Sequence, residues 1–510
     1  MPRRPSISSF RAVSLDPEAP EALHRQLYEE LRRAILSGRL GAGSRLPASR
    51  EFASVSRISR NTVLSAYGQL LAEGYIESRA GSGTFVARSI PEAMTPESPA
   101  PEASVARPGD AGLPGTPRSL SARGRRIADA PILRHPLRTV ANAFRPGLPA
   151  LDHFPMKIWR RLYDRRLRRA SVRQLSYDDP QGYLPLREAI AAHLSASRGA
   201  RCGPEHVIIV NGSQHGVDLT VRMLLDRGDE VWFEDPGYFG ARATLQAHAA
   251  VPVPVPVDSD GLVVSAGIER APNARLVYCT PSHQNPLGVT MTLGRRMALT
   301  QWAERTGAWI LEDDNASEYR YRGRPLASLQ GIDPSDRVIY VGTFSKVLFS
   351  SLRIGYVVAP SDLVSVLVRA RVLVDRQSPG LSQAVLADFM NEGHFARHIR
   401  RMRTLYGARL AALLRAVRVH AGDVLEVDEG EGGMSRVAWL PPGVDDLEAG
   451  AEVARAGIQC LPLSEYAMQN GERGGLILGF TGSDEAAIEH GIQTVAACVR
   501  AVQARTFVRA

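Results

Sequence analysis

The sequence predicts an α/β protein in two folded parts that a long tether joins, and three observations lead to this prediction. Over most of the chain, short apolar runs such as HVIIV, EVWFE and RVIYVG alternate with helical patterns. Such alternation is typical of βα units on a mostly parallel sheet with both faces covered. Residues 91–118 hold seven prolines and almost no large apolar side chains, so they cannot bury enough surface to fold. Three helical patterns and two short strands precede that segment.

Composition narrows the class of protein. At 510 residues the chain is too long for one ordinary domain, and no apolar run reaches the roughly 18 residues of a membrane helix. The four cysteines lie far apart, without metal-ligand or disulfide spacing, and no apolar segment of a secretory signal follows the N-terminal arginines. We therefore expect a cytoplasmic protein that holds no metal and does not enter a membrane. Residues 1–88 carry 13 arginines against 8 acidic residues, which favours an anionic partner.

The first folded part, residues 21–88, contains three predicted helices and a hairpin. Leucine or isoleucine recurs every four residues from Leu23 to Ile35, which marks one face of an amphipathic helix. A second helix is predicted in LPASREFASVS. A third is predicted in SRNTVLSAYGQLLAEG, with Ser59 as N-cap and Gly74 at its end. Two short strands around a Gly-Ser-Gly turn follow in YIESRAGSGTFVA. Three helices and such a hairpin together predict a winged helix-turn-helix.

The blocks LPASR, SRNTV, AYGQLLAEGYI and GSGTFV, in this order, resemble the DNA-binding domain of GntR-type bacterial regulators. The resemblance implies that the third helix docks into the major groove of double-stranded DNA and that the wing lies near the minor groove. An arginine and an amide at the start of that helix can read base edges, while hydroxyls hold phosphates. The residues that the resemblance implies in DNA contact are Arg45, Arg50, Ser59, Arg60, Asn61, Thr62 and Gly81. One departure is Ser56-Arg57, where the family usually has Leu-Gly.

We predict that residues 89–138 form a proline-rich flexible linker and that residues 139–505 form the body. In parallel sheets ligands bind at the C-terminal ends of the strands, so the polar residues that follow the predicted strands are the candidates for a site. Ser213 and Gln214 open a helix after HVIIV, where backbone amides suit a phosphate. The other polar residues at strand ends are Tyr238, Asn285, Asp313, Thr343, Ser345 and Lys346.

Lys346 has a chemical meaning of its own. The chain has 62 lysines and arginines, but only Lys157 and Lys346 are lysine. Lysine, unlike arginine, can lose its proton and act as an amine nucleophile, so a Schiff-base residue has to remain lysine. Pyridoxal phosphate needs such an amine, together with a carboxylate for its ring nitrogen and a cation with hydroxyls for its phosphate.

Over about residues 140–505 the chain resembles a fold-type-I aminotransferase, which implies pyridoxal 5'-phosphate as cofactor and a smaller C-terminal α/β subdomain. By this resemblance Lys346 forms the Schiff base and Asp313 bonds the pyridine nitrogen. Tyr238 would stack on the ring, and Asn285 would bond its phenolic oxygen. The residues implied around the phosphate are Ser213, Gln214, Thr343, Ser345 and Arg353, with Tyr177 reaching the phosphate of the partner subunit.

Two departures from the aminotransferase pattern argue against efficient turnover. Asn315 stands two residues after Asp313, where the family usually has a tyrosine that bonds the phenolic oxygen. The segment GLILGF carries no arginine for a substrate carboxylate, and GEGGMSRVAW offers only Arg436.

A GntR-like module joined by a linker to an aminotransferase-like body resembles the MocR group of transcriptional regulators. The resemblance implies a homodimer, often with each DNA-binding domain crossing to the other subunit's body. We expect a regulator that senses pyridoxal phosphate, or an amine or amino-acid effector, through aldimine formation at Lys346. Two alternatives stay open: an active aminotransferase that carries a DNA-binding module, and a DNA-binding protein whose body is a cofactor-free dimerisation scaffold. The effector, the target genes and the direction of regulation are not determined by the sequence.

Overall fold

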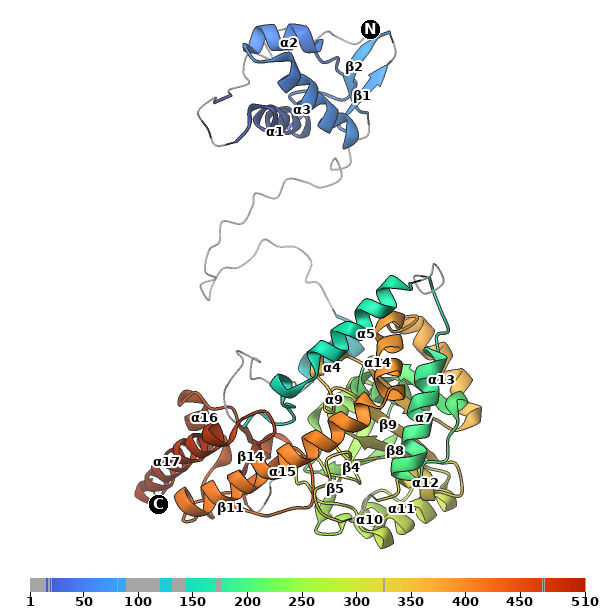
Figure 1. Ribbon diagram of the computed structural model, residues 1–510, viewed down its shortest axis with the longest axis vertical. Coiled ribbons are helices and arrows are strands. Elements are labelled where there is room, and N and C mark those ends of the chain that lie inside the picture. Colours follow the sequence, from blue (N-terminus) through green and yellow to red (C-terminus); the bar gives the residue numbers. More distant parts are fainter. Residues whose placement is uncertain are drawn as a thin grey trace. The chain divides into compact units, whose positions relative to one another are not determined.

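The computed structural model describes residues 21–79, 81–88, 120–130, 144–170, 176–323, 326–469 and 473–509, and also the single residues 15, 16, 19 and 471. The chain divides into two compact units, Met1–Thr116 and Pro117–Ala510 (Figure 1). Each unit is described by itself below.

The N-terminal unit is a winged helix-turn-helix, as the sequence predicts. Its elements are α1 (Leu23–Leu36), α2 (Ser49–Ser56), α3 (Arg60–Ala72), β1 (Ile76–Arg79) and β2 (Gly83–Val86), with β1 and β2 paired antiparallel. The apolar face of α1 packs with α3 because side chains four residues apart lie on one side of a helix, and Leu27, Leu31 and Val63 are fully buried between them. Ser59 caps α3 by accepting a hydrogen bond from the Thr62 N–H at 3.1 Å.

The turn between α2 and α3 contains a strained residue. Arg57 ends α2 with φ 54° and ψ 40°, a left-handed conformation that suits glycine, the residue usual at this position in GntR-type regulators. A residue with a Cβ is destabilised by roughly 1–2 kcal/mol in this conformation. Glycine avoids this clash, but it loses more backbone entropy on folding, which offsets part of the advantage.

We expect Arg57→Gly to raise the free energy of unfolding of the N-terminal unit by about 1 kcal/mol, because glycine adopts this conformation without the Cβ clash. Urea unfolding followed by circular dichroism measures the change. Arg57→Ala is the matched control, since it removes the charge but keeps the Cβ, and it should bring no gain. Equal stabilisation by both substitutions would mean that the arginine charge, not its backbone, is unfavourable.

The body is built on an eight-stranded sheet with the order β3-β10-β9-β8-β7-β4-β5-β6. Neighbouring strands from β9 to β5 pair parallel, whereas β10 runs antiparallel to both β9 and β3, and β6 runs antiparallel to β5. The strands are β3 (Val207–Val210), β4 (Glu230–Asp235), β5 (Val251–Asp258), β6 (Gly261–Leu262), β7 (Leu276–Cys279), β8 (Trp309–Asp314), β9 (Val338–Thr343) and β10 (Gly355–Val358). This mixed but mostly parallel sheet confirms the predicted class and brings the C-terminal ends of β3, β4, β7, β8 and β9 to one edge.

Helices cover both faces of this sheet (Figure 1). Successive residues of a strand point to opposite faces, so Trp232 of β4 stacks on Trp302 at 3.8 Å between ring centroids while Phe233 packs with the cluster on the other side. The helices of this part are α5 (Met156–Arg168), α7 (Leu184–Arg198), α8 (Ser213–Leu224), α9 (Phe239–Ala247), α10 (Val264–Arg270), α11 (Leu293–Thr306), α12 (Leu329–Ile332), α13 (Ser361–Val374) and α14 (Gly380–Asn391).

A smaller C-terminal subdomain follows the long helix α15 (His394–His420), as the aminotransferase resemblance implies. It has a four-stranded antiparallel sheet in the order β11-β12-β14-β13 and two further helices. Its elements are β11 (Glu426–Val427), β12 (Ser435–Trp439), α16 (Asp446–Arg455), β13 (Leu461–Pro462), β14 (Gly475–Gly479) and α17 (Glu485–Arg509).

One helix lies inside the range predicted as a linker. Helix α4 (Ala122–Asp129) is capped by the Ser121 hydroxyl and contacts α9, where Arg126 Nε donates to the Ala247 carbonyl at 3.4 Å. The limits 21–88, 89–138 and 139–505 stay predictions, and residues 122–129 within the second range are helical. No helix in the described ranges is long and apolar enough to cross a membrane.

Candidate functional site

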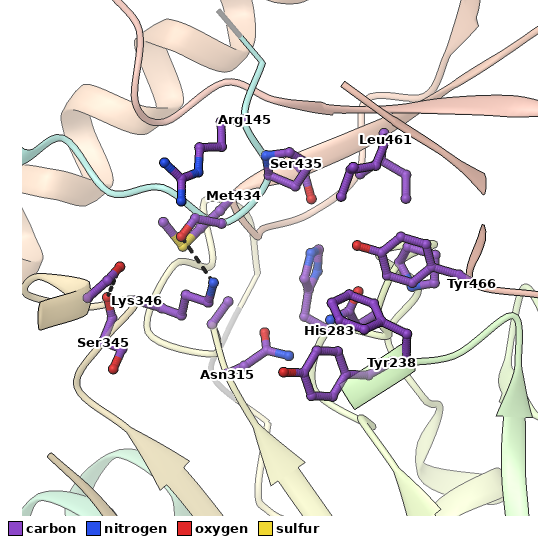
Figure 2. A pocket seen from close by; sticks show the side chains of 18 of the residues that line it. Arg145, Tyr238, His283, Asn315, Ser345, Lys346, Met434, Ser435, Leu461 and Tyr466 are labelled. Carbon is purple, nitrogen blue, oxygen red and sulfur yellow. Dashed lines mark hydrogen bonds between the residues drawn. The ribbon is translucent and has the colours of Figure 1, made fainter. Parts of the chain in front are cut away.

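A cavity of about 530 Å³ lies at the edge of the large sheet where the parallel strands end, and β12, β13 and β14 of the subdomain supply its other wall (Figure 2). The structure brings together nine of the ten predicted cofactor residues, counting Lys346 and leaving out Tyr177. Eight of them end or follow strands that finish at this edge, and Arg353 precedes β10, which starts there. The nine are Ser213, Gln214, Tyr238, Asn285, Asp313, Thr343, Ser345, Lys346 and Arg353.

Tyr177 lies apart from the cavity. Its side chain is 69% exposed, and the Arg376 guanidinium stacks over its ring at 4.0 Å. An exposed ring in this position is free to meet a second subunit, and its proposed contact with the partner's phosphate stays a prediction.

Lys346 follows β9 and projects into the cavity, where its Nζ donates to the Gly147 carbonyl at 3.2 Å (Figure 2). Burial lowers the pKa of Lys346, the Arg145 charge lowers it further, and the Asp313 carboxylate opposes both. A lowered pKa raises the fraction of neutral amine near pH 7, and the neutral amine is the nucleophilic form.

Asp313 at the end of β8 has one satisfied and one unsatisfied oxygen. Its Oδ2 accepts a 2.7 Å hydrogen bond from the Tyr278 hydroxyl, whereas Oδ1 is buried without a partner among the described residues. Burial raises the pKa of Asp313 to about 6, although the Tyr278 hydrogen bond acts in the other direction. Because a buried oxygen without a donor is costly, this site fits a ligand with an N–H at Oδ1, such as a protonated pyridine nitrogen.

The polar groups around the start of α8 suit a phosphate. Arg353 donates to the Asn211 carbonyl at 2.8 Å and has no carboxylate partner in the described part of the chain. The Ser345 hydroxyl is buried without a partner among those residues. Gly212 precedes α8 with φ 89°, and a Cβ there would come within 2.9 Å of Arg353. A cation, a hydroxyl and the free N–H groups of a helix N-terminus together form an anion site.

Tyr238 and Gln214 support each other at the side of the cavity. The Tyr238 hydroxyl donates to Gln214 Oε1 at 3.3 Å, and burial raises the pKa of Tyr238 to about 12, so the ring stays neutral. Gln214 Nε2 donates to the Gly240 carbonyl and to the Thr244 hydroxyl. The donor of Gln214 that remains for a phosphate is therefore its backbone N–H.

Glu234 is a positioning residue that sequence reasoning missed. Its Oε2 accepts from the N–H and hydroxyl of Thr280 and from Gln284 Nε2, and the Asn285 N–H donates to the Thr280 hydroxyl at 3.0 Å. These bonds hold the loop that presents Asn285 to the cavity. Burial raises the pKa of Glu234 to about 7. The run EVWFE is a plain β-strand pattern and carries no signal of this role.

The cavity also contains residues from irregular or distant segments that no strand-end rule identifies. These residues are Arg145, Met434, Ser435, Leu461, Tyr466 and Ile477. His283 and Asn315, which follow β7 and β8, also line the cavity. Burial, with the Arg436 charge, lowers the pKa of His283 to about 3, so this ring is neutral. Arg436, which the sequence offered for a carboxylate, is buried and donates to the carbonyls of Ser435 and Glu429, outside the cavity lining.

The residues predicted to contact DNA lie at the start of α3, before α2 and in its first turn, and in the wing. Those with exposed side chains or an exposed backbone are Arg45, Arg50, Ser59, Arg60, Asn61 and Gly81. Thr62 is half-buried beside the Ser59 cap. Arg60 Nε lies 3.4 Å from the Ser49 hydroxyl, so its guanidinium is held only loosely.

Two family profiles match the chain: bacterial regulatory proteins of the gntR family over residues 23–86, and aminotransferase class I and II over residues 152–461. The probable rhizopine catabolism regulatory protein MocR of Rhizobium meliloti is 43% identical over 491 residues, which cover 96% of each chain. The pyridoxine biosynthesis transcriptional regulator PdxR of Corynebacterium glutamicum is 31% identical, over 93% of this chain and 95% of its own.

Solved structures resemble the body. The α-aminoadipate aminotransferase LysN of Thermus thermophilus, complexed with N-(5'-phosphopyridoxyl)-L-leucine, superposes with a TM-score of 0.66 at 28% identity. The match covers 71% of this chain and 92% of LysN. An archaeal alanine:glyoxylate aminotransferase gives a TM-score of 0.69 at 26% identity, over 75% of this chain and 98% of that chain.

Proposed function

Because this chain belongs to the MocR-type transcriptional regulators of the GntR family, we propose that its cavity binds pyridoxal 5'-phosphate and that occupancy of the cavity controls DNA binding. The observation that supports this most directly is the convergence of three groups on one cavity. These are the Lys346 amine, the unsatisfied Asp313 oxygen and the Arg353 cation without a carboxylate.

Each residue has a task toward this cofactor. Pyridoxal phosphate, when bound, supplies an aldehyde at which one primary amine can replace another. Lys346 provides the resident amine, and Asp313 keeps a proton on the ring nitrogen. Tyr238 packs on the ring and Asn285 bonds its phenolic oxygen. Ser213, the Gln214 N–H, Thr343, Ser345 and Arg353 bind the phosphate.

We propose a sensor in preference to a turnover enzyme. Asn315 lines the cavity where an aminotransferase usually has a tyrosine, and Ile477 of the GLILGF segment also lines it, where the family pattern would provide an arginine. In a sensor, an amine or amino acid that occupies the cavity changes the relative stability of two arrangements of the dimer that differ in DNA affinity. A homodimer, with Tyr177 of one subunit near the phosphate of the other, is part of this proposal.

DNA titration tests the proposal. The full-length protein, with and without pyridoxal phosphate and candidate amines, is titrated onto the region upstream of its own gene, and affinity is measured by fluorescence anisotropy. We expect the cofactor, alone or with an amine, to change the affinity. Rapid multiple turnover of an amino donor, without any change in DNA affinity, would favour the alternative of an active aminotransferase.

We expect Arg60→Ala to weaken specific DNA binding by roughly 10- to 100-fold, because a bidentate arginine–base contact contributes about 1–3 kcal/mol. The same anisotropy titration measures this loss. Arg25→Ala on α1 is the matched control, since Arg25 is exposed and, among the described residues, forms an ion pair only with Glu21. Equal losses for both variants would mean that Arg60 contributes only general positive charge.

A further inference from the structure

Arg145 is a cation in the cavity that has no role in the proposed binding of the cofactor. Three positively charged residues line the cavity in the described part of the chain: Arg145, Lys346 and Arg353. Lys346 is the amine of the proposed site and Arg353 faces the phosphate position, so Arg145 remains. We propose that Arg145 binds the anionic group of the effector, and hence that the effector is a primary amine that carries an acidic group, such as an amino acid. This inference rests on the proposed function.

The guanidinium of Arg145 has no partner in the part of the chain that the structure describes. It makes no hydrogen bond or ion pair with any described residue, although its side chain is half-buried. The other arginines near the cavity differ, because Arg353 donates to Asn211 and Arg436 donates to two carbonyls and lies over the Phe480 ring. A partly desolvated cation without a counter-ion is unfavourable, and a bound anion removes that cost.

The backbone around Arg145 is held in place. The Gly479 N–H donates to the Phe144 carbonyl at 2.9 Å, and the Thr481 hydroxyl donates to the Leu148 carbonyl at 2.6 Å. Phe144 is fully buried with φ 72°, a conformation that a bulky side chain rarely adopts and that fixes the direction in which the next residue leaves the chain. Arg145 is therefore presented by a rigid segment and is already directed into the cavity.

Arg145 also lies where an effector would need it. Figure 2 shows its guanidinium directed toward the Lys346 amine, and its charge is felt at that amine. The rest of the described cavity lining on the subdomain side offers no competing cation, because Ile477, Leu461 and Met434 are apolar, and His283 is neutral. An amino acid placed with its amine at the Lys346 end can reach Arg145 with its acidic end.

The test uses pairs of amines that differ only in charge. The full-length protein loaded with pyridoxal phosphate is titrated with α-, β- and γ-amino acids, each beside the amino alcohol in which the carboxylate is reduced to a hydroxymethyl group. The change in the visible absorbance band of the bound cofactor reports binding. We expect the wild-type protein to bind at least one acid about tenfold more tightly than its alcohol, and Arg145→Gln to remove that preference. Arg145→Lys should keep part of it.

A ratio of acid to alcohol isolates recognition from the effect of Arg145 on Lys346, because a changed lysine pKa alters both ligands equally. Arg160→Gln on α5, whose side chain is 83% exposed, is the matched control and should keep the full preference. If alcohols bind as well as acids, if no acid changes the band at millimolar concentration, or if Arg145→Gln keeps the preference, the inference is wrong. If the wild-type protein takes up no pyridoxal phosphate, the proposed function itself fails.

Discussion

Replacement of Lys346 by alanine is expected to leave the protein without a visible absorbance band after incubation with pyridoxal phosphate, and without covalent label after borohydride reduction. The reason is chemical: Lys346 is the amine in the cavity, and the only other lysine in the sequence, Lys157, is exposed on α5. Intact-mass and peptide mass spectrometry measure the label. The loss should be complete, because no arginine can replace the amine.

Lys157→Ala is the matched control for this prediction and should keep both the band and the label. Lys346→Arg adds a second comparison, since it keeps the positive charge and removes the nucleophile. It should behave like alanine in labelling. Stoichiometric reduced cofactor on a residue other than Lys346 would contradict the proposed site, and a wild-type protein without label at Lys346 would leave the cofactor-free scaffold as the better interpretation.

Asp313→Asn is expected to stabilise the protein without cofactor and to weaken cofactor binding at the same time. Burial raises the pKa of Asp313 from 3.8 to about 6, so the folded state holds this proton where the unfolded chain has lost it. The ionisation of Asp313 therefore lowers the free energy of unfolding more and more as the pH rises from about 4 to about 6, and by a constant amount above pH 6. The difference corresponds to about 3 kcal/mol.

Asparagine removes this penalty while its side-chain oxygen can still accept from Tyr278. Urea unfolding should show the cofactor-free variant to be more stable than wild type at pH 8, by up to about 3 kcal/mol, and equal to it near pH 4. Absorbance titration should show pyridoxal phosphate bound at least about 100-fold more weakly, because a buried charge pair is lost. Asp260→Asn, in an exposed turn, is the control and should change neither quantity. A variant that is less stable at pH 8 would show that the Asp313 charge is compensated within the protein.

Most of the site residues that sequence reasoning identified share one property: they follow strands, whereas Arg353 and Tyr177 came only from the family resemblance. The topology of a parallel sheet brings Tyr238, Asp313 and Lys346 to one edge whatever the loops do, so local patterns suffice to find them. Arg145 lies on an irregular segment, and Ile477 comes from a strand of the other sheet. Their arrival at the cavity depends on how the subdomain packs, and no local periodicity encodes that.

Helix α4 is an element that the sequence prediction missed for a different reason. Composition predicts residues 89–138 as one proline-rich linker, but the short run after Ser121 has its own cap and a basic helical sequence. A prediction made from the average composition of residues 89–138 could not resolve eight helical residues whose stability depends on contact with α9.

The cavity has its two walls on two different sheets, one from the eight-stranded body and one from the four-stranded subdomain. In the proposed sensor, a molecule bound between them would act as a spacer, because its size would limit how closely the subdomain can approach the body. The size of the effector would then be converted into a displacement of the subdomain, without a reaction having to run to completion.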